Sequence, residues 1–244
     1  MTRPFEELAY CATEMGELIL RRRKHLSQDS DIYEIKLNGE FLMSSLFTEG
    51  ETELARRGLA GLQGEDLGVV VGGLGLGYTA LAALENRAVG SLLVVDRMQE
   101  VISWHEQGLV PAGKELSADP RCRFVHADFF ALARGAGFDP GAGGRTFDAI
   151  LLDIDHSPRA LLHPAHAWLY EREGLSRLAS FLRPGGAFAL WSNDPPDEEF
   201  ADALEDVFAE AQTHTVSFYN PHQNRESANT VYVARRGRER DGGS

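Results

Sequence analysis

Glycine occupies four of the six positions from 72 to 77, and this run constrains the chain more than any other feature. It stands in the segment VVVGGLGLGYTALAAL, where an apolar stretch ends and a helical pattern begins. Glycines permit a sharp reversal and let a ligand approach backbone that carries no Cβ. The N-terminus of the following helix also offers unpaired N–H groups to an electronegative group. A tight turn without a ligand is the alternative. We expect a ligand-binding turn made by Gly72, Gly73, Gly75 and Gly77.

From residue 67 onward, apolar strands alternate with amphipathic helices, which predicts a mostly parallel sheet covered on both faces. The expected strands span 68–71, 91–96, 123–127, 147–153, 187–192, 213–219 and 230–234, and the expected helices span 78–85, 99–107, 165–181 and 198–211. No helix separates the last two strands, so they should form a hairpin whose final strand is antiparallel. The fold class is therefore α/β, with a Rossmann-like sheet of seven strands.

A smaller unit precedes this sheet. Residues 5–24 place apolar side chains at helical spacing and end in four cations, which predicts an amphipathic helix. The alternating segments 31–37 and 40–43 flank Asn38-Gly39, a strong signal for a β-hairpin. A connecting helix is expected over 48–62. We therefore divide the chain into an N-terminal unit (1–62), a catalytic domain (63–236) and a disordered tail (237–244).

Charge and composition narrow the partners. The net charge is −13, so the surface should repel nucleic acid and tolerate or attract a cationic substrate. The apolar runs are too short to span a membrane, and glutamates interrupt any signal sequence at the start, so we expect a cytoplasmic protein. Cys11 and Cys122 are expected to be reduced. His163 and His166 are spaced like ligands, but no cysteine or carboxylate completes the set. We expect no metal, and we interpret both histidines as surface or capping residues.

Two carboxylates stand at the carboxyl ends of the second and third strands of the predicted sheet. Asp96 stands where a carboxylate can accept both hydroxyls of an adenosine ribose, with a helix N-cap as the alternative. The glycine run and Asp96 suit both a dinucleotide and an S-adenosyl nucleoside. Asp128 stands where an S-adenosylmethionine site needs an acceptor for the adenine amino group, and Phe129 could flank the ring. The segment Leu-Arg-Pro-Gly-Gly (182–186) before the fifth strand is also more typical of S-adenosylmethionine enzymes than of dehydrogenases.

A second group of polar side chains follows the fourth and fifth strands. Asp153 ends one strand and is followed by Asp155 and His156, and Asp194 comes after the next strand. The carboxyl ends of parallel strands meet at the ligand-binding edge of an open sheet, so these side chains should converge there. We expect Asp194 to face Asp153 and to hold a cationic amine, whereas the acids at 197–199 are interpreted as ordinary helix N-terminal charge.

In this order the motifs resemble the class I S-adenosylmethionine-dependent methyltransferase fold. Within that fold the chain most resembles the spermidine synthase-like group, the polyamine aminopropyltransferases, over residues 31–234. The resemblance rests on YEIKLNGEFLMSS, TEGETELA, GGLGLGY, VVDR, DPRCRFVHADFF, FDAILLDIDHSP and FLRPGG.

The resemblance implies a donor site in which Gly73, Gly75 and Gly77 hold the amino-acid portion, Asp96 the ribose and Asp128 the adenine. It implies that Asp153 is the catalytic carboxylate that accepts a proton from an attacking amine. The family's second acid after this strand is displaced here by one residue, to Asp155, and His156 stands in its place. The acid that the family carries inside the glycine loop is absent. Glu51 lies in a segment that the family uses as a lid over the acceptor, with a solvated helix face as the alternative.

Three functions are compatible with these motifs. The first is transfer of an aminopropyl group from decarboxylated S-adenosylmethionine to an amine. The second is methylation of a small molecule by S-adenosylmethionine, which the loop without an acid favours because that donor carries a carboxylate. The third is a non-catalytic nucleoside-binding protein. Related enzymes are often dimers, so the resemblance also implies a homodimer.

Overall fold

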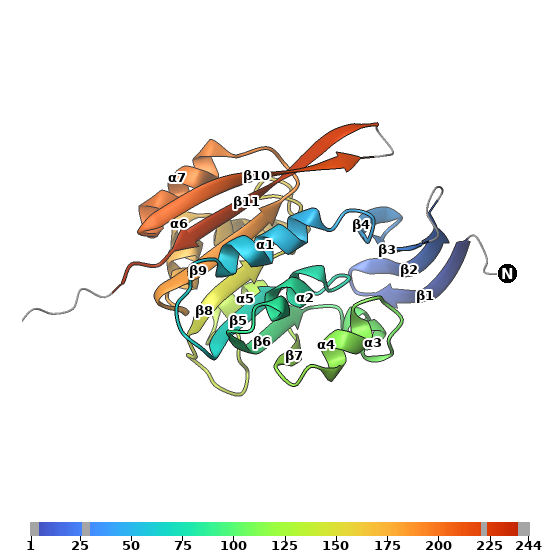
Figure 1. Cartoon of the computed structure of the whole chain (residues 1–244), viewed down its shortest axis with the longest axis horizontal. Coiled ribbons are helices and arrows are strands. Elements are labelled where there is room, and N and C mark those ends of the chain that lie inside the picture. Colours follow the sequence, from blue (N-terminus) through green and yellow to red (C-terminus); the bar gives the residue numbers. More distant parts are fainter. Residues whose placement is uncertain (1–4, 26–29, 221–223, 239–244) are drawn as a thin grey trace, which may run out of the picture.

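The chain folds into two β-sheets that lie beside each other, a small antiparallel one and a large mostly parallel one (Figure 1). The computed structural model describes residues 5–25, 30–220 and 224–238. The small sheet has the strand order β1-β2-β3-β4, and the large sheet has the order β10-β11-β9-β8-β5-β6-β7. In the described part of the chain, no helix has the length and apolar character needed to cross a membrane.

The small sheet begins with a hairpin where we predicted a helix. Its strands are β1 (Phe5–Thr13), β2 (Gly16–Lys24), β3 (Asp31–Leu37) and β4 (Glu40–Ser44). The helix predicted over 5–24 is therefore wrong. Leu18 and Leu20 point to the same face of the strand and are both fully buried, and β2 pairs with β3 from Leu18 to Lys24. This pairing outweighs the local helical spacing of the apolar side chains. Gly16, at φ +117°, provides the turn between β1 and β2.

The hairpin predicted at Asn38-Gly39 is confirmed. Both residues have positive φ, at 53° and 83°, as a type I′ turn requires. The Asn38 side chain also joins this turn to the preceding one. Its Oδ1 accepts a hydrogen bond from Glu17 N at 3.0 Å, and its Nδ2 donates to Met15 O at 2.9 Å. The two turns are therefore fixed against each other.

The large sheet confirms the predicted seven strands. They are β5 (Leu67–Gly72), β6 (Val89–Asp96), β7 (Cys122–His126), β8 (Phe147–Leu152), β9 (Leu182–Ser192), β10 (Glu210–Asn220) and β11 (Arg225–Arg235). The pairs among β5 to β9 are parallel, whereas β11 runs antiparallel to both β9 and β10. The final strand is thus antiparallel, as the missing helix indicated. The tail predicted to be disordered lies, from residue 239 on, outside the described residues.

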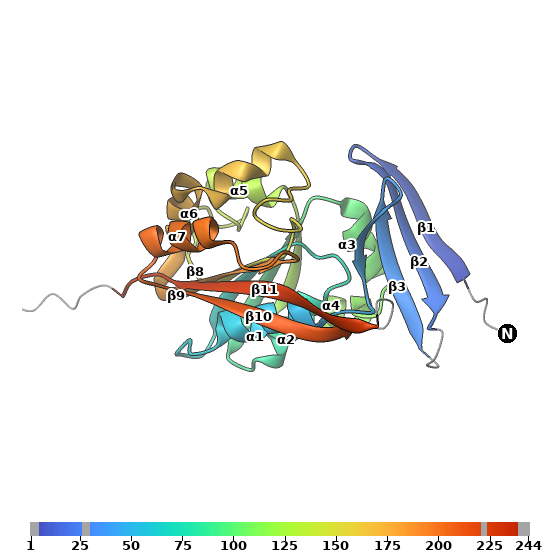
Figure 2. The same cartoon turned by 90° about the horizontal axis from the view of Figure 1, so that it is seen from above.

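Helices cover both faces of this sheet (Figure 2). One face carries α1 (Glu49–Leu59), α2 (Tyr78–Glu85), α3 (Gln99–Glu106) and α4 (Gly113–Ala118). The other carries α5 (Phe129–Arg134), the 3₁₀ helix η1 (Pro164–Tyr170), α6 (Arg172–Ala179) and α7 (Glu198–Val207). The single helix predicted over 165–181 is two pieces, because Glu171 adopts an extended conformation between them. The helices α4 and α5 were not predicted.

Candidate functional site

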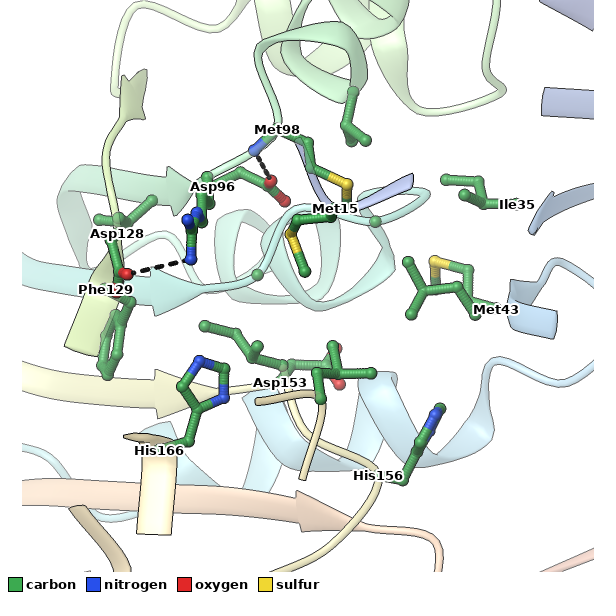
Figure 3. A pocket seen from close by; sticks show the side chains of 18 of the residues that line it. Met15, Ile35, Met43, Asp96, Met98, Asp128, Phe129, Asp153, His156 and His166 are labelled. Atoms are coloured by element: carbon green, nitrogen blue, oxygen red, sulfur yellow. Dashed lines mark hydrogen bonds and ion pairs between the residues drawn. The ribbon is translucent and has the colours of Figure 1, made fainter. Parts of the chain in front are cut away.

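A pocket lies where the small sheet meets the carboxyl ends of the parallel strands (Figure 3). The small sheet and the turn between β1 and β2 provide an apolar wall of Met15, Ile35, Leu42 and Met43. The large sheet and its loops provide the polar groups, among them Asp96, Asp128, Asp153, His156 and His166. Glu51 reaches the pocket from the first turn of α1. The pocket therefore joins one apolar side to a rim of carboxylates and imidazoles.

The glycine run forms the turn between β5 and α2 and contributes two residues to the pocket lining. Gly73 has φ +95°, and a Cβ there would lie 2.0 Å from the backbone oxygen of Asp153. A Cβ on Gly75 would lie 2.4 Å from the sulfur of Met43. Gly72 and Gly77 are outside the lining. They allow close packing instead, Gly72 against Phe129 and Gly77 at φ +91° against α4.

The N–H groups of this turn are bound within the protein. Gly73 N donates to Val95 O at 2.9 Å, Leu74 N to Asp96 Oδ2 at 2.9 Å, and Gly77 N to Leu74 O at 2.7 Å. Leu76 N donates to the sulfur of Met43. The unpaired N–H groups that we expected belong to the start of α2, after this turn. The turn itself presents the pocket with backbone that carries no side chain at Gly73 and Gly75.

Asp96 ends β6, and its carboxylate accepts a hydrogen bond from the backbone of the glycine turn. Its Oδ2 accepts from Leu74 N, and its Oδ1 accepts from Met98 N at 2.8 Å. The side chain is buried at the pocket wall, and this burial raises the pKa of its carboxyl although the backbone hydrogen bonds oppose the rise. The Asp96 carboxylate thus lines the pocket and also holds the backbone of Leu74 and of Met98, the N-cap residue of α3. The contact with the start of this helix is the role that we considered as the alternative for Asp96.

Asp128 follows β7 and is the N-cap of α5. Its Oδ1 accepts from Phe130 N at 2.9 Å and from Ala131 N at 3.1 Å, and its Oδ2 lies 3.5 Å from Arg97 Nη1. Phe129 also lines the pocket, but it is only 2% exposed and stacks on Phe138 with the ring centroids 4.6 Å apart. Both residues lie at the same end of the pocket (Figure 3). Phe129 is therefore mainly a core residue.

Two carboxylates meet at the other end of the glycine turn. Asp153 follows β8, and its Oδ2 accepts a hydrogen bond from Thr79 Oγ1 at 2.7 Å. Burial raises the pKa of the Asp153 carboxyl, and the Thr79 hydrogen bond opposes this rise. Glu51 is 8% exposed, and burial followed by repulsion from Asp153 raises the pKa of its carboxyl. Glu51 is therefore no part of a solvated helix face.

Asp155 has a different place from the one we expected. The side chain is 1% exposed and does not line the pocket. Its carboxylate accepts hydrogen bonds from Leu162 N and Tyr170 Oη, both at 2.7 Å, and contacts His166 Nδ1 at 2.9 Å. These bonds fold the segment between β8 and α6 around one buried charge. The structure thus places Asp155 behind the pocket wall, and not at the pocket surface where we expected it to act with Asp153.

His166 is the site residue that sequence reasoning missed. We interpreted it as a surface or capping residue, but it is buried at the pocket wall. His163 does cap, because its Nδ1 accepts from Ala165 N at 3.1 Å. No local pattern separates the two histidines. The partner that distinguishes His166 is Asp155, eleven residues earlier in an irregular loop.

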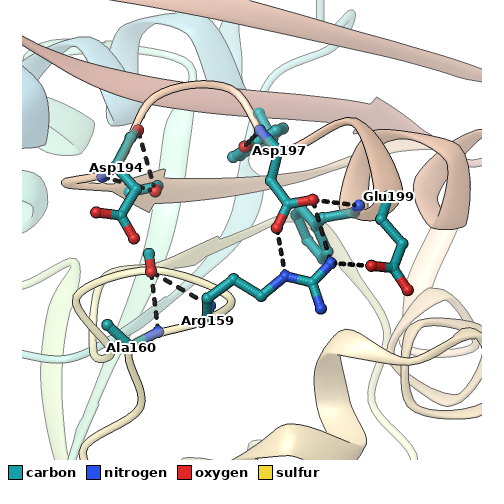
Figure 4. A network of polar contacts seen from close by, with 9 residues as sticks. Arg159, Ala160, Asp194, Asp197 and Glu199 are labelled. Carbon is teal, nitrogen blue, oxygen red and sulfur yellow. Dashed lines mark hydrogen bonds and ion pairs between the residues drawn. The ribbon is translucent and has the colours of Figure 1, made fainter.

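The remaining expected residues divide between the pocket and the surface. His156 lines the pocket as expected. Trp191, which we did not single out above, lines it too, and its indole packs where a Cβ on Gly50 would lie. Asp194 is exposed and outside the lining, so it does not face Asp153 across the pocket; Glu51 occupies that position. Figure 4 shows Asp194 beside the network in which Arg159 binds two acids of the α7 N-terminus. Those acids, Asp197 and Glu199, are the helix N-terminal charge that we expected.

The residues that line the pocket suit an adenosyl group with a cationic tail better than they suit a metal ion. Among the described residues no group of three or more histidine, cysteine or carboxylate side chains is placed to hold a metal ion. The pocket instead offers a surface without Cβ atoms at Gly73 and Gly75, carboxylates at both ends, and aromatic side chains beside one end.

The fold is similar to that of solved spermidine synthases. A spermidine synthase in complex with the transition-state analogue AdoDATO has a TM-score of 0.72 and 16% identity, over 95% of this chain and 74% of that one. The spermidine synthase from Thermotoga maritima has a TM-score of 0.69 and 16% identity, over 95% and 73% of the two chains.

A probable spermidine synthase from Corynebacterium glutamicum ATCC 13032 has a TM-score of 0.65 and 15% identity, over 96% of this chain and 81% of that one. No family model matches the chain, and no curated protein matches it in sequence. The likeness thus resides in the three-dimensional arrangement, including the small sheet. The chain has a spermidine synthase-like α/β fold.

Proposed function

We propose that the protein is a transferase that binds decarboxylated S-adenosylmethionine in this pocket and transfers its aminopropyl group to an amine acceptor. The observation that supports the proposal most strongly is the pair of buried carboxylates, Glu51 and Asp153, beside Gly73. Two carboxylates that repel each other in a buried site are stabilised by a bound cation. Both the donor's propylamine and the acceptor amine supply such a charge.

Asp153 has the properties of a general base for this reaction. Its raised pKa strengthens it as a base, and Thr79 occupies only Oδ2, which leaves Oδ1 for the acceptor amine. The amine nitrogen attacks the carbon beside the sulfonium and forms a C–N bond as the C–S bond breaks. The thioether leaves with the bonding electron pair, and the proton of the amine passes to Asp153. Holding the two reactants in line provides much of the acceleration.

The choice of donor follows from where the charges lie. The loop from 72 to 77 carries no acid, which would favour S-adenosylmethionine and methyl transfer as the second candidate. Glu51 nevertheless supplies a second carboxylate from α1 at this same end of the pocket. A donor with its own carboxylate would meet repulsion from Asp153, and from Glu51 whenever Glu51 is ionised, whereas the decarboxylated donor presents only an ammonium. The pair therefore favours aminopropyl transfer.

A transfer assay with a matched pair of variants tests the proposal. Asp153→Asn removes the base while keeping the shape of the side chain, and Asp202→Asn, an exposed position on α7, is the control. With decarboxylated donor and a diamine, wild type and D202N should release methylthioadenosine at similar rates, and D153N should be slower by about 10²–10⁴-fold. Wild-type turnover only with S-adenosylmethionine would support the methyltransferase. No turnover with either donor, despite binding, would leave a nucleoside-binding protein.

A further inference from the structure

The His166 ring is held on two sides while one of its nitrogens stays open to the pocket. Its Nδ1 lies 2.9 Å from Asp155 Oδ1 and 3.1 Å from Oδ2. Its face stacks on Phe130, with the ring centroids 3.6 Å apart and the planes 9° apart. The stacking fixes the plane of the ring, and the contact with Asp155 fixes which edge of the ring faces that carboxylate.

The surroundings of Asp155 determine which ring nitrogen carries the hydrogen. Leu162 N and Tyr170 Oη both donate to this carboxylate, which is 1% exposed. A buried carboxylate accepts hydrogen bonds, so His166 Nδ1 donates as well. In the neutral ring the other nitrogen, Nε2, then carries a lone pair and is an acceptor.

Nε2 opens on the pocket. Among the described residues it has no hydrogen-bond partner, and it is not one of the sealed polar atoms that lack one. Because the ring stacks on Phe130, it lies at the end of the pocket formed by Asp128 and Phe129, as Figure 3 shows. At this end Asp128 Oδ1 is already occupied by two backbone N–H groups of α5, and Oδ2 faces Arg97. Nε2 is therefore an uncommitted acceptor in the wall of this end.

We propose that His166 binds the nucleobase of the donor, with Nε2 accepting a hydrogen bond from the exocyclic amine of a 6-aminopurine. Asp155 is the positioning residue that fixes its tautomer and orientation. This inference rests on the proposed function, which assigns the end of the pocket at Asp128 to the base. It makes His166 a specificity determinant, because a 6-oxopurine would place an acceptor against the lone pair of Nε2. A site built to pair with an N–H group rejects a ligand that lacks it.

Binding of two nucleosides to three proteins tests this role without depending on turnover. The probes are 5′-methylthioadenosine and 5′-methylthioinosine, measured by titration calorimetry. His166→Asn keeps a donor at the position of Nδ1 and removes Nε2. His163→Asn is the control, because His163 is exposed at the start of the same 3₁₀ helix and outside the pocket.

Wild type and H163N should prefer the adenine nucleoside by about tenfold or more, as expected for one hydrogen bond and the repulsion that replaces it. H166N should lose most of this preference, mainly through weaker binding of the adenine nucleoside. An unchanged preference in H166N would overturn the role of His166 while leaving the proposed function intact, as would a wild type that binds both nucleosides equally. A wild type that binds neither would overturn both.

A second measurement covers the case in which H166N does not fold. In wild type labelled with ¹⁵N-histidine, the His166 Nε2 signal should move when 5′-methylthioadenosine saturates the protein. At saturation with 5′-methylthioinosine it should move less. A signal that stays in place with the adenine nucleoside bound would overturn the assignment.

Discussion

Thr79 Oγ1, in the first turn of α2, donates a hydrogen bond of 2.7 Å to Oδ2 of Asp153 at the end of β8. The bond connects the helix that follows the glycine turn with the carboxylate to which we assign the chemistry. It also opposes the effect of burial on the Asp153 pKa. The ionisation of Asp153 is therefore influenced by the helix that follows the glycine turn.

Removing the Thr79 hydroxyl should move the pH dependence of the reaction. In Thr79→Val the carboxylate loses a donor that stabilises its charged form, so the Asp153 pKa should rise further. A hydrogen bond to a charged group corresponds to about one pKa unit or more. The acid limb of the rate–pH profile should shift to higher pH by that amount, and Thr79→Ser should restore it. A profile identical to wild type in T79V would show that this bond does not set the ionisation.

Glu51 should strengthen binding of the cationic donor but lower the free energy of unfolding. The folded protein raises the pKa of this carboxyl above its ordinary value of 4.5, so folding favours the protonated form. The resulting loss of stability is absent below pH 4.5. It grows as the pH rises through the raised pKa of Glu51 in the folded protein. Glu51→Gln should therefore raise the free energy of unfolding near pH 8 by about 1–3 kcal/mol, with little change near pH 4. The variant should then unfold at a higher denaturant concentration at the higher pH.

The same substitution should weaken binding of the cationic donor, because one of the two carboxylates is lost. An E51Q protein that is less stable than wild type at alkaline pH would contradict this account of Glu51. Denaturation curves at the two pH values, with donor titrations on the same samples, separate the two effects.

Asp96 should matter for both binding and stability. Asp96→Ala removes the acceptor for the proposed ribose hydroxyls and leaves the amides of Leu74 and Met98 without their partner. We expect donor affinity to fall by about 1–3 kcal/mol, and the free energy of unfolding to fall by a similar amount. Asp96→Asn, which keeps one acceptor, should be intermediate. Unchanged donor binding in a folded D96A protein would place the ribose elsewhere.

Acid should weaken the support of the glycine turn through His105. This ring is fully buried, and its Nε2 lies 2.9 Å from Gly75 O. Burial lowers the pKa of His105 from 6.5 to about 4, so the unfolded chain binds this proton more readily. The contribution of the neutral His105 ring to the free energy of unfolding is present above pH 6.5. It falls by about 3 kcal/mol as the pH drops towards 4. His105→Gln should show less loss of stability between these pH values, and an equal loss would exclude His105 as the cause.

Local signals in the sequence were enough for most of the fold. Asn38-Gly39 specified its hairpin because the turn depends on positive φ at two adjacent residues. The missing helix between the last strands likewise revealed the antiparallel β11. The N-terminal helix was predicted wrongly because apolar residues from Phe5 to Met15 satisfy a helical period. The deciding interactions are the pairings of β2 with β1 and β3, which a helical period within the segment 5–24 does not reveal.

The site shows the same division. Asp96, Asp128 and Asp153 follow strand ends, so the parallel sheet alone brings them to one edge, and all three line the pocket. Glu51 and His166 reach it through tertiary packing, from the helix α1 and from the 3₁₀ helix η1. Asp155 could not be distinguished from Asp153 by position, because its role depends on donors located seven to fifteen residues later.

Titration of the wild-type protein with the two donors tests the central claim most directly. The claim is that the pocket between Gly73, Asp128 and the pair Glu51–Asp153 binds an S-adenosyl sulfonium nucleoside with a cationic tail. Calorimetry should show saturable binding of decarboxylated S-adenosylmethionine and binding of S-adenosylmethionine that is weaker by about tenfold or more. Absence of binding for both sulfonium nucleosides would contradict the claim.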